Sequence, residues 1–285
     1  MKVRPYSRLL RASIVWVMLF PAVSNAQAVR DDHRVPQAAA TTLSSDALIA
    51  TGEWERSSGG LSGGGGSLDW LHTARPGTNV SLGLAAYRLG GSQRTLGRAG
   101  AFFPIAARWT LEPQVSLGGG NTAGVGFLHQ QYRATLGFRA SSRLYLRAQE
   151  EYFHIGDSNG HLLSGGVSVL PSRLLSIDMS YAHSAGGNLG TQFVSGRFDL
   201  YRRTLRPFAG FAVGQTAPVV FDVGFGQQLV SQDLHEGFVG FVFPIAAAEF
   251  TVALDWIQVG STQRSTLTAG VKIPIRTTSR LRSTP

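Results

Sequence analysis

Apolar and polar residues alternate along most of this chain, and this period of two limits the possible folds more than any other feature. The segment Glu249–Val259, EFTVALDWIQV, places Phe, Val, Leu and Trp at every second position, with Glu, Thr, Ala and Asp between them. Arg264–Ile273 and Gln130–Phe138 follow the same rule. Successive side chains of a strand point to opposite faces, so this pattern predicts strands with one apolar and one polar face. Helical periodicity is scarce, and we predict an all-β fold.

Two architectures fit such strands: a soluble β-sandwich, whose polar faces meet water, and a membrane barrel, whose apolar faces meet lipid. Charged residues make up only 15% of the chain and Lys occurs only twice, which is unlike the surface of a soluble protein. The alternating segments have about the length of a tilted strand that crosses a bilayer. Aromatic residues lie near the expected strand ends, where membrane girdles form, at Trp54, Trp70, Trp109, Tyr152, Tyr181, Tyr201, Phe243 and Trp256. The sequence therefore favours a transmembrane antiparallel up-and-down β-barrel.

A strand–proline–strand corner recurs along the chain. It reads FPIAAR at Phe103–Arg108, LPSR at Leu170–Arg173 and FPIAAAE at Phe243–Glu249, and Val271–Ile275, VKIPI, is half of such a corner. Proline can close a strand where the ladder needs no N–H donor. Such barrels have tight turns at the periplasmic end and longer loops outside. We therefore predict that the proline corners face the periplasm and that the Gly-, Ser- and Asn-rich segments form the outer loops.

The number of alternating segments predicts about 14 strands, with 12 to 16 allowed. Ala217–Asp233 is the uncertain piece, because it could be an outer loop or could extend its flanking strands; we assign it to a loop. The expected strands lie near 46–56, 66–74, 79–88, 95–103, 109–118, 125–138, 143–154, 161–170, 173–183, 191–201, 207–214, 237–243, 247–258 and 265–275.

The N-terminus has the three parts of a secretory signal peptide. Cationic residues precede the apolar run Ser13–Val23, and the small residues of Ser24–Ala28 offer a cleavage site. The run is too short for a spanning helix, the alternative interpretation. We expect a signal peptide at 1–26, a periplasmic lead-in at 27–45, the barrel at 46–275 and a basic tail at 276–285. The expected location is the outer membrane of a Gram-negative bacterium, with membrane lipid and the barrel-insertion machinery as partners.

The polar faces of the predicted strands supply the candidate functional residues, which would line the lumen. Their charges are of mixed sign, so the simplest interpretation is a set of ion pairs that fill a narrow barrel. The alternative is a passive channel or export pore for a polar solute or polysaccharide, which we favour over a structural or surface-interaction barrel. The candidates are Glu53, Glu55, Asp69, Glu112, Arg133, Arg147, Glu151, Asp178, Arg197, Asp199, Glu249, Asp255 and Lys272.

Other functions have weaker support in the sequence. A lipid-modifying enzyme at the rim would need a serine beside a histidine. Three histidines and three serines lie near the predicted outer ends, but neighbouring residues of a strand, such as His183 and Ser184, point in opposite directions. These residues are His154, His161, His183, Ser158, Ser164 and Ser184. We expect no enzyme, no metal and no cofactor. Nucleic acid is not expected as a partner, because the chain has no basic stripe with interleaved aromatic residues.

The signal peptide, the single barrel, the Gly-rich outer loops and RPFAGFAVG at Arg206–Gly214 before a long loop together resemble the YaiO-type outer-membrane β-barrel proteins. The chain is also similar to the barrel portion of exopolysaccharide exporters. The resemblance covers Asp46–Ile275 and implies an outer-membrane barrel without catalytic residues. In one respect the chain departs from this class, whose members commonly end on an aromatic residue that the insertion machinery reads: here RTTSRLRSTP follows Ile275.

Overall fold

The structure is a computed structural model that describes residues 46–58, 60–75, 77–89, 92–122, 125–155, 158–185, 190–216, 219–220, 228–229 and 232–275. The predicted signal peptide, the lead-in and the basic tail lie outside these described residues. No helix among them is long and apolar enough to cross a membrane.

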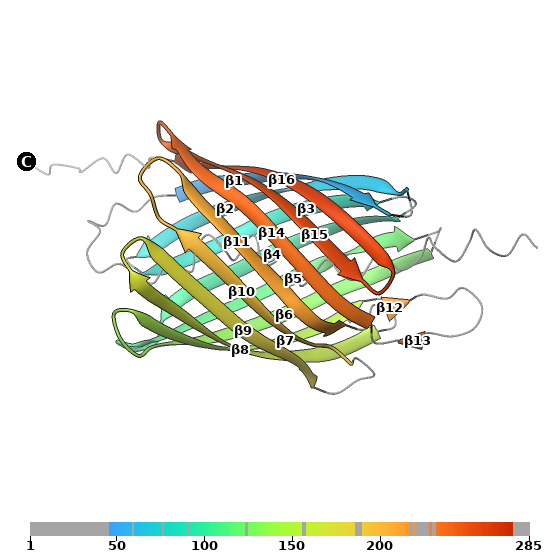
Figure 1. Ribbon diagram of the computed structural model, residues 1–285, viewed down its shortest axis with the longest axis horizontal. Helices are drawn as coiled ribbons and strands as arrows, with labels where there is room; N and C mark the ends of the chain where they lie inside the picture. The colour runs from blue at the N-terminus through green and yellow to red at the C-terminus, as the bar shows by residue number, and fades with distance from the viewer. Residues whose placement is uncertain are drawn as a thin grey trace, which may run out of the picture.

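The described chain forms a closed barrel of antiparallel strands in the order β1-β16-β15-β14-β11-β10-β9-β8-β7-β6-β5-β4-β3-β2 (Figure 1). The strands are β1 Asp46–Ser57, β2 Ser62–Arg75, β3 Thr78–Leu89, β4 Ser92–Pro104, β5 Trp109–Thr122, β6 Val125–Arg139, β7 Leu144–Ile155, β8 Ser158–Ser172, β9 Leu175–Ala185, β10 Gln192–Leu200, β11 Arg206–Thr216, β14 Gln232–Ile245, β15 Ala248–Val259 and β16 Thr262–Ile275. The first strand pairs along its whole length with the last, from Asp46 opposite Ile275 to Ser57 opposite Arg264, and so closes the barrel. The predicted fold class and strand number are confirmed.

The segment of uncertain assignment does not add a strand to the barrel. Its short strands β12 Val219–Val220 and β13 Gln228–Leu229 pair with each other in a separate two-stranded sheet. The next barrel strand begins earlier than predicted, at Gln232. In the barrel, β11 therefore pairs directly with β14, although β12 and β13 lie between them in sequence.

Two Gly-rich segments predicted as loops lie inside strands instead. Gly64 and Gly65 belong to β2, and Gly119 and Gly120 belong to β5. A Cβ atom at Gly65 would overlap the ring of Tyr87, and one at Gly64 would overlap the carbonyl oxygen of Glu53. Glycine is thus required here by close approach of neighbouring groups and not by a turn, which explains why the loop prediction was wrong.

The two faces of the barrel wall differ in composition. Leu254 and Leu267, which lie opposite each other on β15 and β16, are 52% and 45% exposed, whereas Ala253, next to Leu254 in sequence, faces inward and is 2% exposed. Leu68, Leu84 and many other large apolar side chains are exposed in the same way. An apolar exterior of this kind matches the lipid-facing band of a transmembrane barrel.

The two ends of the barrel are here called the tight-turn end and the loop end. The tight-turn end contains Asp46, Ile275 and the connections β2–β3, β4–β5, β6–β7, β8–β9, β10–β11 and β14–β15. The proline corners are at this end, with Pro104 closing β4 and Pro244 near the end of β14. The predicted difference in loop length is wrong for most connections at the loop end, because β3–β4, β5–β6, β7–β8 and β15–β16 are each joined by only two residues. Gly260 in the β15–β16 connection has a φ of 55°. The β11–β14 connection at this end is long, as predicted.

Candidate channel lumen

The strand register and the alternation of burial place every predicted lumen residue on the inner face of the wall, and none of them is exposed. These residues are Glu53, Glu55, Asp69, Glu112, Arg133, Arg147, Glu151, Asp178, Arg197, Asp199, Glu249, Asp255 and Lys272. They come from strands all around the barrel and together make much of the inner face ionic.

Most of these charges are held in ion pairs. Arg133 and Glu151 are 2.8 Å apart, with side chains 8% and 5% exposed, and Gln131 donates a hydrogen bond of 2.6 Å to the same carboxylate. Two nitrogens of Arg133 bind Oε2 of Glu151, at 3.0 and 2.8 Å. Arg197 donates two hydrogen bonds to Asp199, at 2.7 and 2.5 Å. Buried charges need such partners, so the pairs fix the shape of the inner wall.

Sequence reasoning missed several inward-facing cations. Arg94, Arg206 and Arg264 each lie one residue before the predicted start of a strand, and the structure begins all three strands earlier. Arg264 lies 3.6 Å from Glu55, and Arg206 pairs with Glu249. Arg98 lay within a predicted strand, but Gly97 and Gly100 weaken the alternation there. If these three strands had been predicted to start one residue earlier, Arg94, Arg206 and Arg264 would have been placed on their inner faces.

The half of the lumen toward the loop end is filled by side chains. Many inward-facing residues at this level are buried, whereas side chains beside a wide water-filled channel would keep accessible surface. They come from strands on all sides of the barrel: Glu55, Ser57, Arg94, Leu96, His129, Gln131, Glu151, Ala182, Ser184, Ala212, Thr216, Leu234, Asp255, Ile257, Val259 and Arg264. The arrangement in this structure is therefore that of a closed lumen at the loop end.

One side of the inner face is apolar, which corrects the expectation of polar inner faces. On β11, β14 and β15, Ala212, Leu234, Ile257 and Val259 form a buried cluster, with Phe193 of β10 packed against it. A second cluster joins Phe208, Val242 and Ala253, with Phe238 beside it. The guanidinium of Arg197 lies 4.4 Å from the centre of the Phe208 ring, so the ionic and apolar parts of the wall meet there.

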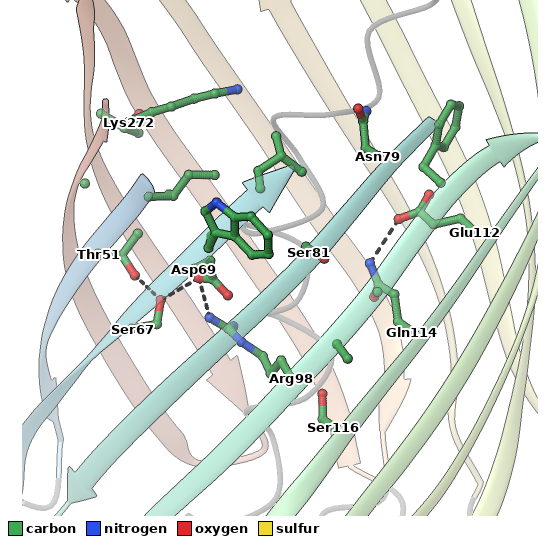
Figure 2. Close-up of a pocket in the computed structure, with 18 of the residues that line it drawn as sticks. Thr51, Ser67, Asp69, Asn79, Ser81, Arg98, Glu112, Gln114, Ser116 and Lys272 are labelled. Carbon is green, nitrogen blue, oxygen red and sulfur yellow. Dashed lines mark hydrogen bonds and ion pairs between the residues drawn. The ribbon is translucent and has the colours of Figure 1, made fainter. Parts of the chain in front are cut away.

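A cavity of about 160 Å³ lies in the half of the lumen toward the tight-turn end (Figure 2). A hydrogen-bonded chain crosses its wall: Thr51 and Ser67 are 2.7 Å apart, Ser67 donates to Asp69 at 3.2 Å, and Arg98 donates to Asp69 at 2.6 Å. Figure 2 also shows Glu112 beside Gln114, which donates to it at 3.0 Å, and Lys272 across the cavity. Further lining comes from Ile49, Leu71, Phe102, Phe208, Asn79, Ser81 and Ser116. The cavity therefore offers both hydrogen-bonding groups and apolar surface.

The residues considered for catalysis do not form a catalytic arrangement in the part of the chain that the structure describes. His161 contacts Glu150 on the outer face, with Nδ1 and Oε1 3.1 Å apart. Ser184 is buried and faces inward, whereas His183 beside it is exposed. No group of three or more His, Cys, Asp or Glu among the described residues could hold a metal ion.

Comparison with known proteins shows the class of fold. No family model and no curated protein matches the sequence. Among solved structures, the CymD monoaromatic hydrocarbon channel has a TM-score of 0.58 at 9% identity, covering 81% of this chain and 88% of CymD. The Pseudomonas putida toluene transporter TodX gives 0.56 at 9% identity, covering 82% and 90%. A bacterial polysaccharide outer membrane secretin gives 0.54 at 11% identity, covering 83% and 100%.

This chain thus has the fold of outer-membrane β-barrels, a class that includes channels. At identities this low the likeness extends to the fold alone. The resemblance to YaiO-type proteins in particular stays a prediction.

Proposed function

We propose that this protein is an outer-membrane channel that passes small polar solutes, such as mono- or oligosaccharides, through its lumen. The observation that carries the proposal is the cavity at the tight-turn end, where Asp69, Arg98 and Gln114 present hydrogen-bonding groups inside an apolar outer wall. A hydroxylated solute exchanges hydrogen bonds with water for hydrogen bonds with such a wall, so it crosses without a large desolvation penalty. The predicted signal peptide supports the location.

The side chains that fill the lumen toward the loop end limit the conductance of such a channel. Glu55 and Arg264 lie at that level, both side chains are 3% exposed, and they reach each other across the β1–β16 seam at 3.6 Å. Passage requires these side chains to move aside, because no solute fits between buried groups. The channel is therefore of low conductance at rest, and the charged pair of Glu55 and Arg264 is one of the contacts that narrow it.

Conductance in planar bilayers tests this proposal. We expect small single-channel steps from the unsubstituted barrel. The double variant Glu55→Ala/Arg264→Ala should give steps several-fold larger, because it removes both partners of one pair and leaves neither charge buried alone. The matched control is Arg56→Ala/Gln263→Ala, whose side chains are exposed on the outer face beside the same two positions. The control should conduct like the parent.

Absence of any step in the double variant, with the barrel folded, would contradict the channel. That result would instead favour the second candidate, a structural or surface-interaction barrel, which the filled loop half also supports. Equal enlargement by the outer-face control would show that wall distortion, and not the lumen, sets the conductance.

The orientation is a further prediction, with the tight-turn end in the periplasm. The chain has no native Cys, so single substitutions report on their own positions. Ser261→Cys at the loop end should react with a membrane-impermeant maleimide on intact cells, and Ala247→Cys at the tight-turn end should not. Both positions are exposed in the structure. Lysed cells provide the control, because both variants should then react; labelling of Ala247→Cys alone on intact cells would reverse the orientation.

A further inference from the structure

Exposed arginines surround the tight-turn end of the barrel. They are called the arginine collar here and come from five successive connections: Arg75 from β2–β3, Arg108 from β4–β5, Arg143 from β6–β7, Arg173 from β8–β9, and Arg202 and Arg203 from β10–β11. Since these strands are neighbours in the barrel, the collar follows a large part of its circumference and is not gathered in one patch.

The carboxylates at this end do not neutralise the collar. Asp46 is paired with His72 at 2.7 Å, and Glu249 is paired with Arg206. Among the described residues, the ion pairs found at this end involve none of the collar arginines. The collar therefore presents a positive ring to whatever surrounds the tight-turn end.

Exposed apolar side chains accompany the arginines in the same connections. Ile105 is 53% exposed in the β4–β5 connection, Leu174 56% beside Arg173, and Leu205 40% in the β10–β11 connection. Trp109, next to Arg108, is 41% exposed. Apolar and aromatic residues mixed with cations are typical of the interfacial layer of a membrane, where the side chain stem lies among acyl chains and the charge reaches the headgroups.

We propose that the arginine collar binds the anionic phospholipid headgroups of the leaflet around the tight-turn end. A ring of separate cations fits a continuous layer of lipids better than a compact protein partner, which would contact one sector. Arginine suits this role because its planar fork binds phosphate oxygens bidentately. Each basic residue near an anionic membrane surface favours binding by about fivefold. A fixed anionic annulus would hold the barrel at one depth in the bilayer.

The test uses the folded barrel in vesicles and the fluorescence of Trp109, which lies in the collar. Trp54, Trp70 and Trp256 are replaced by Phe so that Trp109 reports alone among the tryptophans of the barrel. Brominated phosphatidylglycerol and brominated phosphatidylcholine are compared as quenchers, which gives their relative affinity for the lipid sites beside Trp109. We expect phosphatidylglycerol to be preferred by about fivefold or more, and the preference to fall in high salt.

The matched variants separate the collar from general charge effects. Arg108→Gln/Arg143→Gln, which removes the collar arginines of the β4–β5 and β6–β7 connections beside Trp109, should bring the two lipids to nearly equal quenching. Arg56→Gln/Arg88→Gln, exposed at the loop end, should leave the preference unchanged. Equal quenching by the two lipids in the barrel with its collar intact would overturn the proposal, as would a preference that the loop-end variant removes. If the collar variant fails to fold, the salt titration of the unsubstituted barrel still tests the proposal. A preference for phosphatidylglycerol that does not fall in high salt would contradict it.

Discussion

Glu151→Ala is expected to destabilise the barrel by about 3–5 kcal/mol, the cost of leaving a buried charge without its partner. Glu151 accepts hydrogen bonds from Arg133 and from Gln131, and its side chain is 5% exposed. The substitution removes the carboxylate that holds both donors, and the guanidinium of Arg133 cannot reach bulk water. The measurement is the free energy of unfolding from a urea titration of the barrel in lipid vesicles.

The neighbouring residue supplies the control. Glu150 follows the same backbone but faces outward, with its side chain 61% exposed, and contacts His161. Glu150→Ala should cost less than about 1 kcal/mol, as exposed pairs do. The double variant Arg133→Ala/Glu151→Ala should be more stable than Glu151→Ala alone, since it removes the stranded charge. A double variant as unstable as the sum of its parts would show that the two charges do not act as a pair.

Leu254→Arg is expected to destabilise the barrel by about 2–4 kcal/mol, because an arginine near the middle of the lipid-facing band must leave water for hydrocarbon. Leu254 is 52% exposed on the outer face of β15. Thr251, three residues earlier, faces inward and lines the cavity, which has room for a longer side chain. Thr251→Arg should therefore be milder in the same urea titration. Equal losses for the two changes would mean that the outer face of β15 does not contact lipid.

The sequence predicted the fold and the facing of residues wherever the alternation was strict. Glu249 and Asp255 could be placed on the inner face because their sequence neighbours, Phe250 and Leu254, are apolar and belong to the outer face. It did not predict which charges meet, because alternation gives the face of a strand but not the register of its neighbour. The pairing of Arg133 with Glu151 depends on the β6–β7 register, in which these two residues lie opposite each other.

The apolar side of the lumen could not be predicted for a related reason. In β11 the residues of both faces are apolar or small, with Phe208 and Ala212 inside and Phe211 and Val213 outside. Without a polar face there is no contrast from which to choose the direction of the core. The arginines at strand starts were missed because the end of a strand is decided by pairing with a neighbour, which local sequence does not contain.

The division of the inner wall into an ionic and an apolar side gives the barrel unequal mechanical compliance. On the ionic side, any sliding of one strand against the next would stretch directional side-chain bonds such as those of Arg133 on β6 with Glu151 on β7. On the side of Ala212, Leu234 and Ile257 the side-chain contacts are non-directional, so a small shift of these strands costs less side-chain energy there, although the backbone ladder is present on both sides. We therefore expect thermal changes in the cross-section of this barrel to be larger on the side of β11, β14 and β15 than on the side of β6 and β7.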